Sequence, residues 1–253
     1  MNEECLKREI MGQNRHQFIY GYNNGKRKKF LSELSIEFPI MIDCNIPMCI
    51  YLREFGLPKI SNDDVDKNKL ISLSREYLSF AIAYEILLKS KSNVDNALLN
   101  VRIKNLIKFF CYDNIKNNMD GLIDAFLESK EFYMSYYLEY LNNGYLDKSI
   151  NDIAVPFLDL EWFISQYKKE LNNQAYFCIL LDKIFDISSS SIMAVNDLIG
   201  SRNNGNISMK VVVEPGKWDS YALSNGQYIE SIHDYDSIEL DDSGKKYIKK
   251  LII

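Results

Sequence analysis

One stretch near the N-terminus limits the folds open to this chain more than any other. Residues 18–31 have the sequence FIYGYNNGKRKKFL, which is an apolar run, a turn rich in glycine and asparagine, and four consecutive cations that open an amphipathic segment. An apolar run, a tight turn and a helix in this order are typical of a strand buried in a parallel sheet and its crossover helix. We therefore expect a strand over 18–22 and a helix from about Gly25 to Glu37, which Pro39 ends.

The turn also has features of a loop that binds phosphate. The backbone N–H groups of such a loop face the anion, and the next helix points its positive dipole end at the same place. Four cations in a first helical turn oppose that dipole, so the arrangement is favourable mainly when an anion is bound. The candidate binding residues are Gly21, Asn23, Asn24, Gly25, Lys26 and Arg27. The alternative is a Gly-Asn turn that precedes a basic, solvent-exposed helix face.

The match to the phosphate-loop motif G-x-x-x-x-G-K-[ST] is partial. The first glycine position holds Tyr20, with Gly21 one place late, and the hydroxyl position holds Arg27. The lysine position is kept by Lys26. Short motifs of this kind recur by chance, so the surrounding strands and helices must support the interpretation.

Composition sets the outer limits. A chain of 253 residues is long enough for one large domain, or one domain with a long insertion, and buries a proper core. A formal net charge of −5 argues against a dedicated nucleic-acid binder, and contact through the cations of 26–29 stays a weaker alternative. The N-terminus has no signal-peptide pattern and no window is apolar enough to span a membrane, so we expect a cytoplasmic protein.

The cysteines and histidines do not suggest a structural metal site. Five cysteines are widely spaced, mostly within apolar runs, and no pair has C-x-x-C spacing. The chain has only two histidines. We therefore expect reduced core cysteines and no structural zinc.

Further along the chain, apolar runs alternate with helical patterns. We expect a second strand over Pro39–Asp43, with Asp43 either near a ligand at the sheet edge or capping a turn, and irregular structure over 45–62. The continuous apolar run 175–182 predicts a central strand that ends at Asp182. Ser188 to Ser191 begin a helix that stops at Gly200, and strands follow over 207–213 and 227–240. This alternation is typical of α/β proteins.

Residues 63–172 differ from the rest. Apolar residues recur at three-and-four spacing over about 70–88 and 98–110, with further helical stretches over 121–129, 131–141 and 158–171. We expect an all-helical block. Its tyrosines between Tyr133 and Tyr140 suit a partner surface, but packing of helix against helix, with the hydroxyls reaching water, explains them better.

The order of these segments resembles a known family. The Gly-Lys loop, the segment ILLDKIFD over 179–186, VNDLI over 195–199, Ser201-Arg202, QYIE over 227–230 and HDY over 233–235 look like bacterial AAA-type P-loop ATPases related to origin-recognition proteins. The similarity covers 15–37 and 175–242. It implies an α/β fold: a three-layer P-loop NTPase-like core with a parallel sheet, formed by 1–62 and 173–253, and a large helical insertion over 63–172. The resemblance also implies that the chain, which stops at Ile253, lacks the family's helical lid.

The resemblance assigns roles, and the chain departs from several of them. Lys26, beside Gly25, matches the lysine that holds the terminal phosphates of ATP, and Asp182 matches the aspartate that helps hold Mg²⁺. Lys183 stands where a glutamate would activate water, and a protonated lysine accepts no proton.

Two further departures concern the metal and the phosphates. Arg27 replaces the hydroxyl that ligates Mg²⁺, and a guanidinium has no lone pair for a metal. Glu214 replaces a neutral residue that faces the γ-phosphate. We interpret the chain as a nucleotide-binding switch with weak or no ATP hydrolysis, at most a slow ATPase. The alternative is a non-catalytic interaction module that presents the helical block to a protein partner or to a second copy of itself.

Overall fold

The computed structural model describes residues 3–22, 25–53, 55–59, 65–111, 115–145, 153, 155–183, 186–201, 205–231, 233–240 and 246–247. The strands are β1 (His16–Tyr20), β2 (Met48–Leu52), β3 (Phe177–Asp182), β4 (Ile207–Val213), β5 (Tyr235–Leu240) and β6 (Lys246–Tyr247). The helices are α1 (Glu3–Gly12), α2 (Gly25–Glu37), α3 (Lys67–Asn93), α4 (Asn96–Arg102), α5 (Lys104–Phe110), α6 (Met119–Asn143), α7 (Leu160–Glu170) and α8 (Ser189–Gly200).

The strands form one sheet in the order β2-β3-β4-β1-β5-β6. β1 to β5 are parallel, and β6 pairs with β5 in the antiparallel direction. The apolar runs expected as strands around 18, 177–182 and 207–213 are therefore parallel members of one sheet, which confirms the α/β class. β4 alone separates β1 from β3, and the three strands are parallel. Gly21, directly after β1, and Asp182 therefore lie at the same edge of the sheet, formed by the carboxyl ends of the strands.

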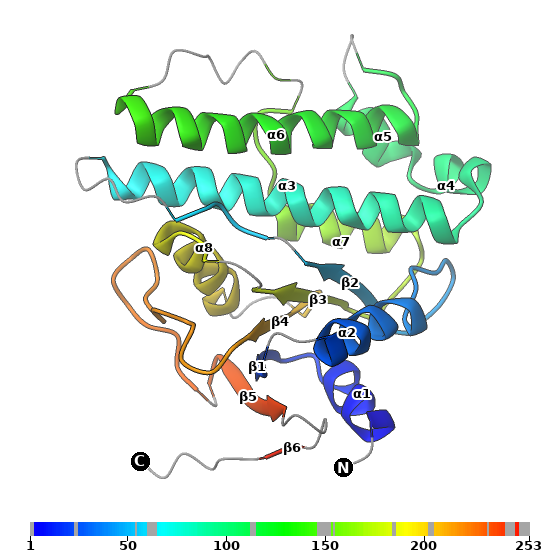
Figure 1. Ribbon diagram of the computed structural model, residues 1–253. Coiled ribbons are helices and arrows are strands. Elements are labelled where there is room, and N and C mark those ends of the chain that lie inside the picture. Colours follow the sequence, from blue (N-terminus) through cyan, green and yellow to red (C-terminus); the bar gives the residue numbers. More distant parts are fainter. Residues whose placement is uncertain are drawn as a thin grey trace.

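Helices cover both faces of this sheet (Figure 1). On one face, α1 and α2 bury apolar side chains such as Leu6 and Leu31 against β1 and its neighbours. On the other face, α3, α7 and α8 pack on the sheet, and α6 lies over α3 as an outer layer. Among the described helices, none is long and apolar enough to cross a membrane.

Several predicted elements are wrong in detail. No strand forms over Pro39–Asp43; the chain there is irregular, and β2 lies at Met48–Leu52, within the stretch expected to be irregular. Of the stretch 227–240, only Tyr235–Leu240 is a strand. The two helices expected over 121–141 are the single helix α6, and the one expected over 98–110 is broken into α4 and α5 at Ile103.

Asp43 consequently lies away from the expected ligand edge. It precedes β2, and its carboxylate accepts hydrogen bonds from Arg102 at 2.6 Å and from Asn172 at 2.8 Å, before the start of β3. Both contacts place Asp43 near the amino ends of β2 and β3. The prediction of a ligand-edge role for Asp43 is wrong because the strand expected to precede it does not form.

Near the amino edge of the sheet lie a buried cation and a half-buried imidazole. Lys210 in β4 is fully buried, and its ammonium donates to the carbonyls of Gln13 at 3.0 Å and Arg15 at 2.6 Å. Burial lowers the pKa of Lys210 to about 8. Burial, together with the charge of Lys210, lowers the pKa of His16 to about 4, and its Nδ1 accepts the Met209 N–H at 3.0 Å. His16 is therefore neutral at pH 7.

Candidate functional site

A buried ion pair joins the start of α2 to the end of β3. The Nη2 atom of Arg27 lies 2.6 Å from Oδ1 of Asp182, and the two side chains are 3% and 2% exposed. The Nη1 atom of Arg27 donates to the carbonyl of Gly21 at 2.6 Å, at the end of β1. One guanidinium thus connects the loop after β1, helix α2 and strand β3.

The sequence explains why these two side chains meet. Asp182 is the last residue of β3, and alternation places it on the same face as Cys178 and Leu180, which pack toward α1 and α2. Arg27 is the third residue of α2 and turns inward. Its neighbours Lys26 and Lys28 are exposed. The basic run therefore divides into one buried cation and a solvent-facing group.

Tyr51 completes the contacts of the aspartate. Its hydroxyl donates to Oδ2 of Asp182 at 2.9 Å from the neighbouring strand β2. Burial, and then the charge of Asp182, raise the pKa of Tyr51, so the hydroxyl keeps its proton. Burial raises the pKa of Asp182, and the Arg27 charge and the Tyr51 hydrogen bond oppose that rise. Each carboxylate oxygen accepts a hydrogen bond, and the adjacent Arg27 charge opposes the approach of a metal ion to Asp182.

Lys183 lies outside this cluster. Its side chain points to the other face of the sheet, where its ammonium donates to the carbonyl of Lys217 and lies 5.8 Å from the centre of the Trp218 ring. Burial lowers the pKa of Lys183. The side chain makes a structural contact with the loop after β4, and it is not placed beside Asp182 as a water-activating group must be.

The remaining predicted residues lie around the Gly21 loop. A Cβ atom at Gly21 would lie 3.2 Å from Cβ of Leu240, so close packing against β5 favours glycine there. At Gly25, the first residue of α2, a Cβ atom would meet nothing within 4 Å. Glu214 follows β4 directly, at the same edge of the sheet as Asp182. Asn23 and Asn24 lie outside the described residues.

Three features of the site are not predicted from the sequence. Tyr51 was missed because β2 was not recognised as a strand. The carbonyl of Gly21 as a guanidinium acceptor gives no sequence signal. The pairing of Arg27 with Asp182 was also not predicted, although each residue was singled out for its own role.

Comparison of the chain with protein-family models, with curated proteins and with solved structures found no match. The functional interpretation therefore depends on the geometry of the chain itself.

Proposed function

We propose that the chain is a degenerate P-loop NTPase-like protein that binds a nucleotide as a switch and hydrolyses it weakly or not at all. One observation supports the proposal above the others. The guanidinium of Arg27 is bonded to Asp182 at 2.6 Å, at the edge where the loop after β1 meets the end of β3. In this proposal the guanidinium supplies the positive charge that Mg²⁺ supplies in an active enzyme.

The surroundings of the pair suit an anion. Helix α2 begins at Gly25, at the carboxyl edge of the sheet, so its positive dipole end lies near the pair, and the exposed Lys26 stands in its first turn. We infer that Lys26 and the loop N–H groups contact the phosphates of ATP, and that bound Mg²⁺ is not required.

Slow or absent hydrolysis follows from the same contacts. An efficient enzyme of this kind holds a metal ion and positions a water molecule. Arg27 and Tyr51 occupy the oxygens of Asp182, and the lysine at 183 faces Lys217. Loss of a general base alone reduces rates by on the order of a hundredfold or more.

Calorimetric titration with ATP tests the proposal. We expect ATP to bind with the same affinity in EDTA and in excess Mg²⁺, and Lys26→Ala to abolish binding. Lys28→Ala is the matched control, because it removes an exposed cation from the same helical turn and leaves the motif lysine in place. Binding that requires Mg²⁺, or equal losses from the two substitutions, would contradict the proposal.

The alternative function, a non-catalytic interaction module, is favoured by a different observation. Both oxygens of Asp182 are satisfied by the chain's own side chains, so the site is stable without a ligand. The helical block also presents Val101, 72% exposed, and Phe109, 51% exposed. Absence of any ATP heat with the wild-type protein, in EDTA and in Mg²⁺, would favour this function over the switch.

A further inference from the structure

A hollow of about 690 Å³ opens beside the carboxyl end of β2, between α3 and α6. Its volume falls within the ~300–1,000 Å³ that is typical of small-molecule sites. Apolar side chains of Leu52, Ala81 and Met134 form part of its wall. Three charged side chains also line it: Arg53, Glu85 and Lys130. The hollow therefore offers an apolar surface next to two cations and one carboxylate.

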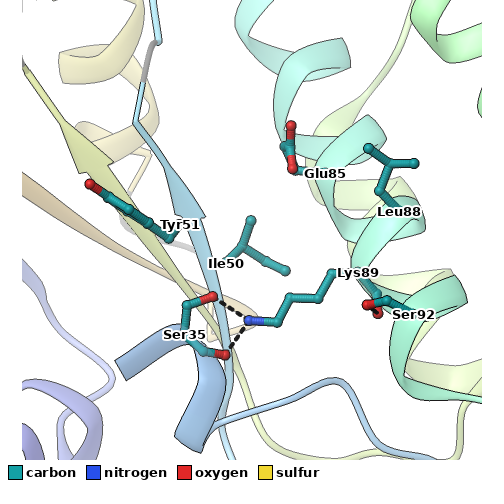
Figure 2. A pocket seen from close by; sticks show the side chains of 7 residues that line it. All are labelled: Ser35, Ile50, Tyr51, Glu85, Leu88, Lys89 and Ser92. Carbon is teal, nitrogen blue, oxygen red and sulfur yellow. Dashed lines mark hydrogen bonds between the residues drawn. The ribbon is translucent and has the colours of Figure 1, made fainter. Parts of the chain in front are cut away.

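A smaller neighbouring hollow of about 280 Å³ shares Glu85, but a lysine of the chain lies across it (Figure 2). Lys89 reaches across it from α3 and donates to Ser35 on α2, and to the carbonyl of Cys49 at 2.7 Å. In this smaller hollow the ammonium of Lys89 thus bonds to groups of the chain itself. Lys89 ties α3 to α2 and to the edge strand β2, which gives it a structural role.

In the larger hollow the charged groups are less engaged. Within the described part of the chain, Arg53 and Glu85 have no hydrogen-bond or ion-pair partner. Glu85 is half-buried, and burial raises its pKa, while the charges of Lys130 and then Lys89 oppose that rise. Lys130 lies 4.9 Å from the centre of the Tyr84 ring, a contact that leaves its N–H groups able to donate. The Glu85 carboxylate is not among the buried atoms without a partner in the described residues, so its oxygens remain open to a bound donor.

We infer that this hollow binds a free amino acid with an apolar side chain. The ammonium group of the ligand faces Glu85. The carboxylate faces Arg53 and Lys130. The side chain lies on Leu52, Ala81 and Met134. Tyr51 lines the hollow and also donates to Asp182, so the hollow adjoins the Arg27 site, but the groups inferred to hold the amino acid differ from those proposed to hold the phosphates.

The test uses the whole protein with ¹³C-labelled methionine methyl groups and L-phenylalanine as the probe, without nucleotide. The Met134 signal is assigned from Met134→Leu, and Met209, buried in the sheet, is an internal reference. We expect L-phenylalanine to shift the Met134 signal saturably and to leave Met209 unchanged. Two analogues each lack one charge: 2-phenylethylamine has no carboxylate, and 3-phenylpropionate has no ammonium. Each should bind at least tenfold more weakly.

Two substitutions separate the charged contact from general effects. Lys130→Met should weaken L-phenylalanine binding about tenfold, as expected for a lost charged contact of about 1.4 kcal/mol. Lys69→Met is the control, because Lys69 also lies over a tyrosine ring, Tyr136, at 6.0 Å, and does not line the hollow. No saturable shift, equal binding of either analogue, or equal weakening by Lys69→Met would each overturn the inference.

Discussion

Replacement of Arg27 by methionine should destabilise the protein strongly. The substitution keeps much of the side-chain volume and leaves Asp182, 2% exposed, buried with the Tyr51 hydroxyl as a remaining donor. Removing one partner of a buried ion pair typically costs about 3–5 kcal/mol, because the other charge stays buried and uncompensated. Asp182→Asn should cost a similar amount, since it leaves the guanidinium without its counter-charge.

The double variant measures the pair itself. Arg27→Met combined with Asp182→Asn leaves no buried charge, so its loss should be smaller than the sum of the single losses by at least about 2 kcal/mol. The assay is urea unfolding at pH 7, followed by tryptophan fluorescence, with unchanged slopes to confirm comparable unfolding. If the single variants fail to fold, Tyr51→Phe is milder, because it removes one hydrogen bond to Asp182 and should cost about 1–3 kcal/mol.

A second ion pair in the same chain is the matched control. Arg102 and Asp43 also lie 2.6 Å apart, but their side chains are 36% and 49% exposed. Their coupling energy in the same cycle should be about 0.2–1 kcal/mol. A coupling between Arg27 and Asp182 as small as that of the exposed pair would refute the argument that burial makes this contact strong.

Three further results are expected. The Arg27→Thr variant should bind ATP only with Mg²⁺. With ATP at a hundredfold excess over its Kd, a melting scan of the variant should show that Mg²⁺ adds about 2.7 kcal/mol of stability, whereas Mg²⁺ should add none to the wild-type protein with ATP. In a phosphate-release assay, Lys183→Glu alone should restore little turnover, because that position faces Lys217, and adding Arg27→Thr should give more than the two single effects combined. His16→Gln should make the free energy of unfolding less sensitive to acid. The folded-state pKa of His16 is lowered to about 4, so His16 contributes stability above about pH 6.5 that is lost as the pH falls from 6.5 to 4, up to about 3 kcal/mol by urea unfolding. An unchanged pH profile in the variant would show that His16 does not titrate as described.

The elements predicted correctly are those whose local signal agrees with their packing. β3 and β4 are buried along their whole length, and the continuous apolar run of β3 is a sufficient signal for a central strand. Helix α8 begins as expected, because the Ser188 hydroxyl accepts the Ser191 N–H at 3.2 Å. In these cases the local sequence pattern and the packing of the element favour the same structure.

The errors arise where distant contacts decide between similar local patterns. Both 39–43 and 48–52 are apolar, and pairing of Cys49 with Cys178 on β3 selects the second. α6 continues through Ser129 because its hydroxyl donates to the carbonyls of Ala125 and Val155, both at 2.9 Å, which lets a polar residue be buried in mid-helix. The Arg27–Asp182 contact joins residues that are 155 positions apart, a relation that no single-sequence pattern contains.

The position of β1 in the sheet has a consequence for synthesis of the chain. β1 leaves the ribosome well before both of its pairing partners, β4 and β5. At typical elongation rates, the apolar strand that carries Phe18 and Ile19 waits on the order of ten to forty seconds with two open edges. An unpaired apolar strand is a site for aggregation. The nascent chain should therefore depend on chaperones that hold the β1 segment until β4 and β5 have been synthesised.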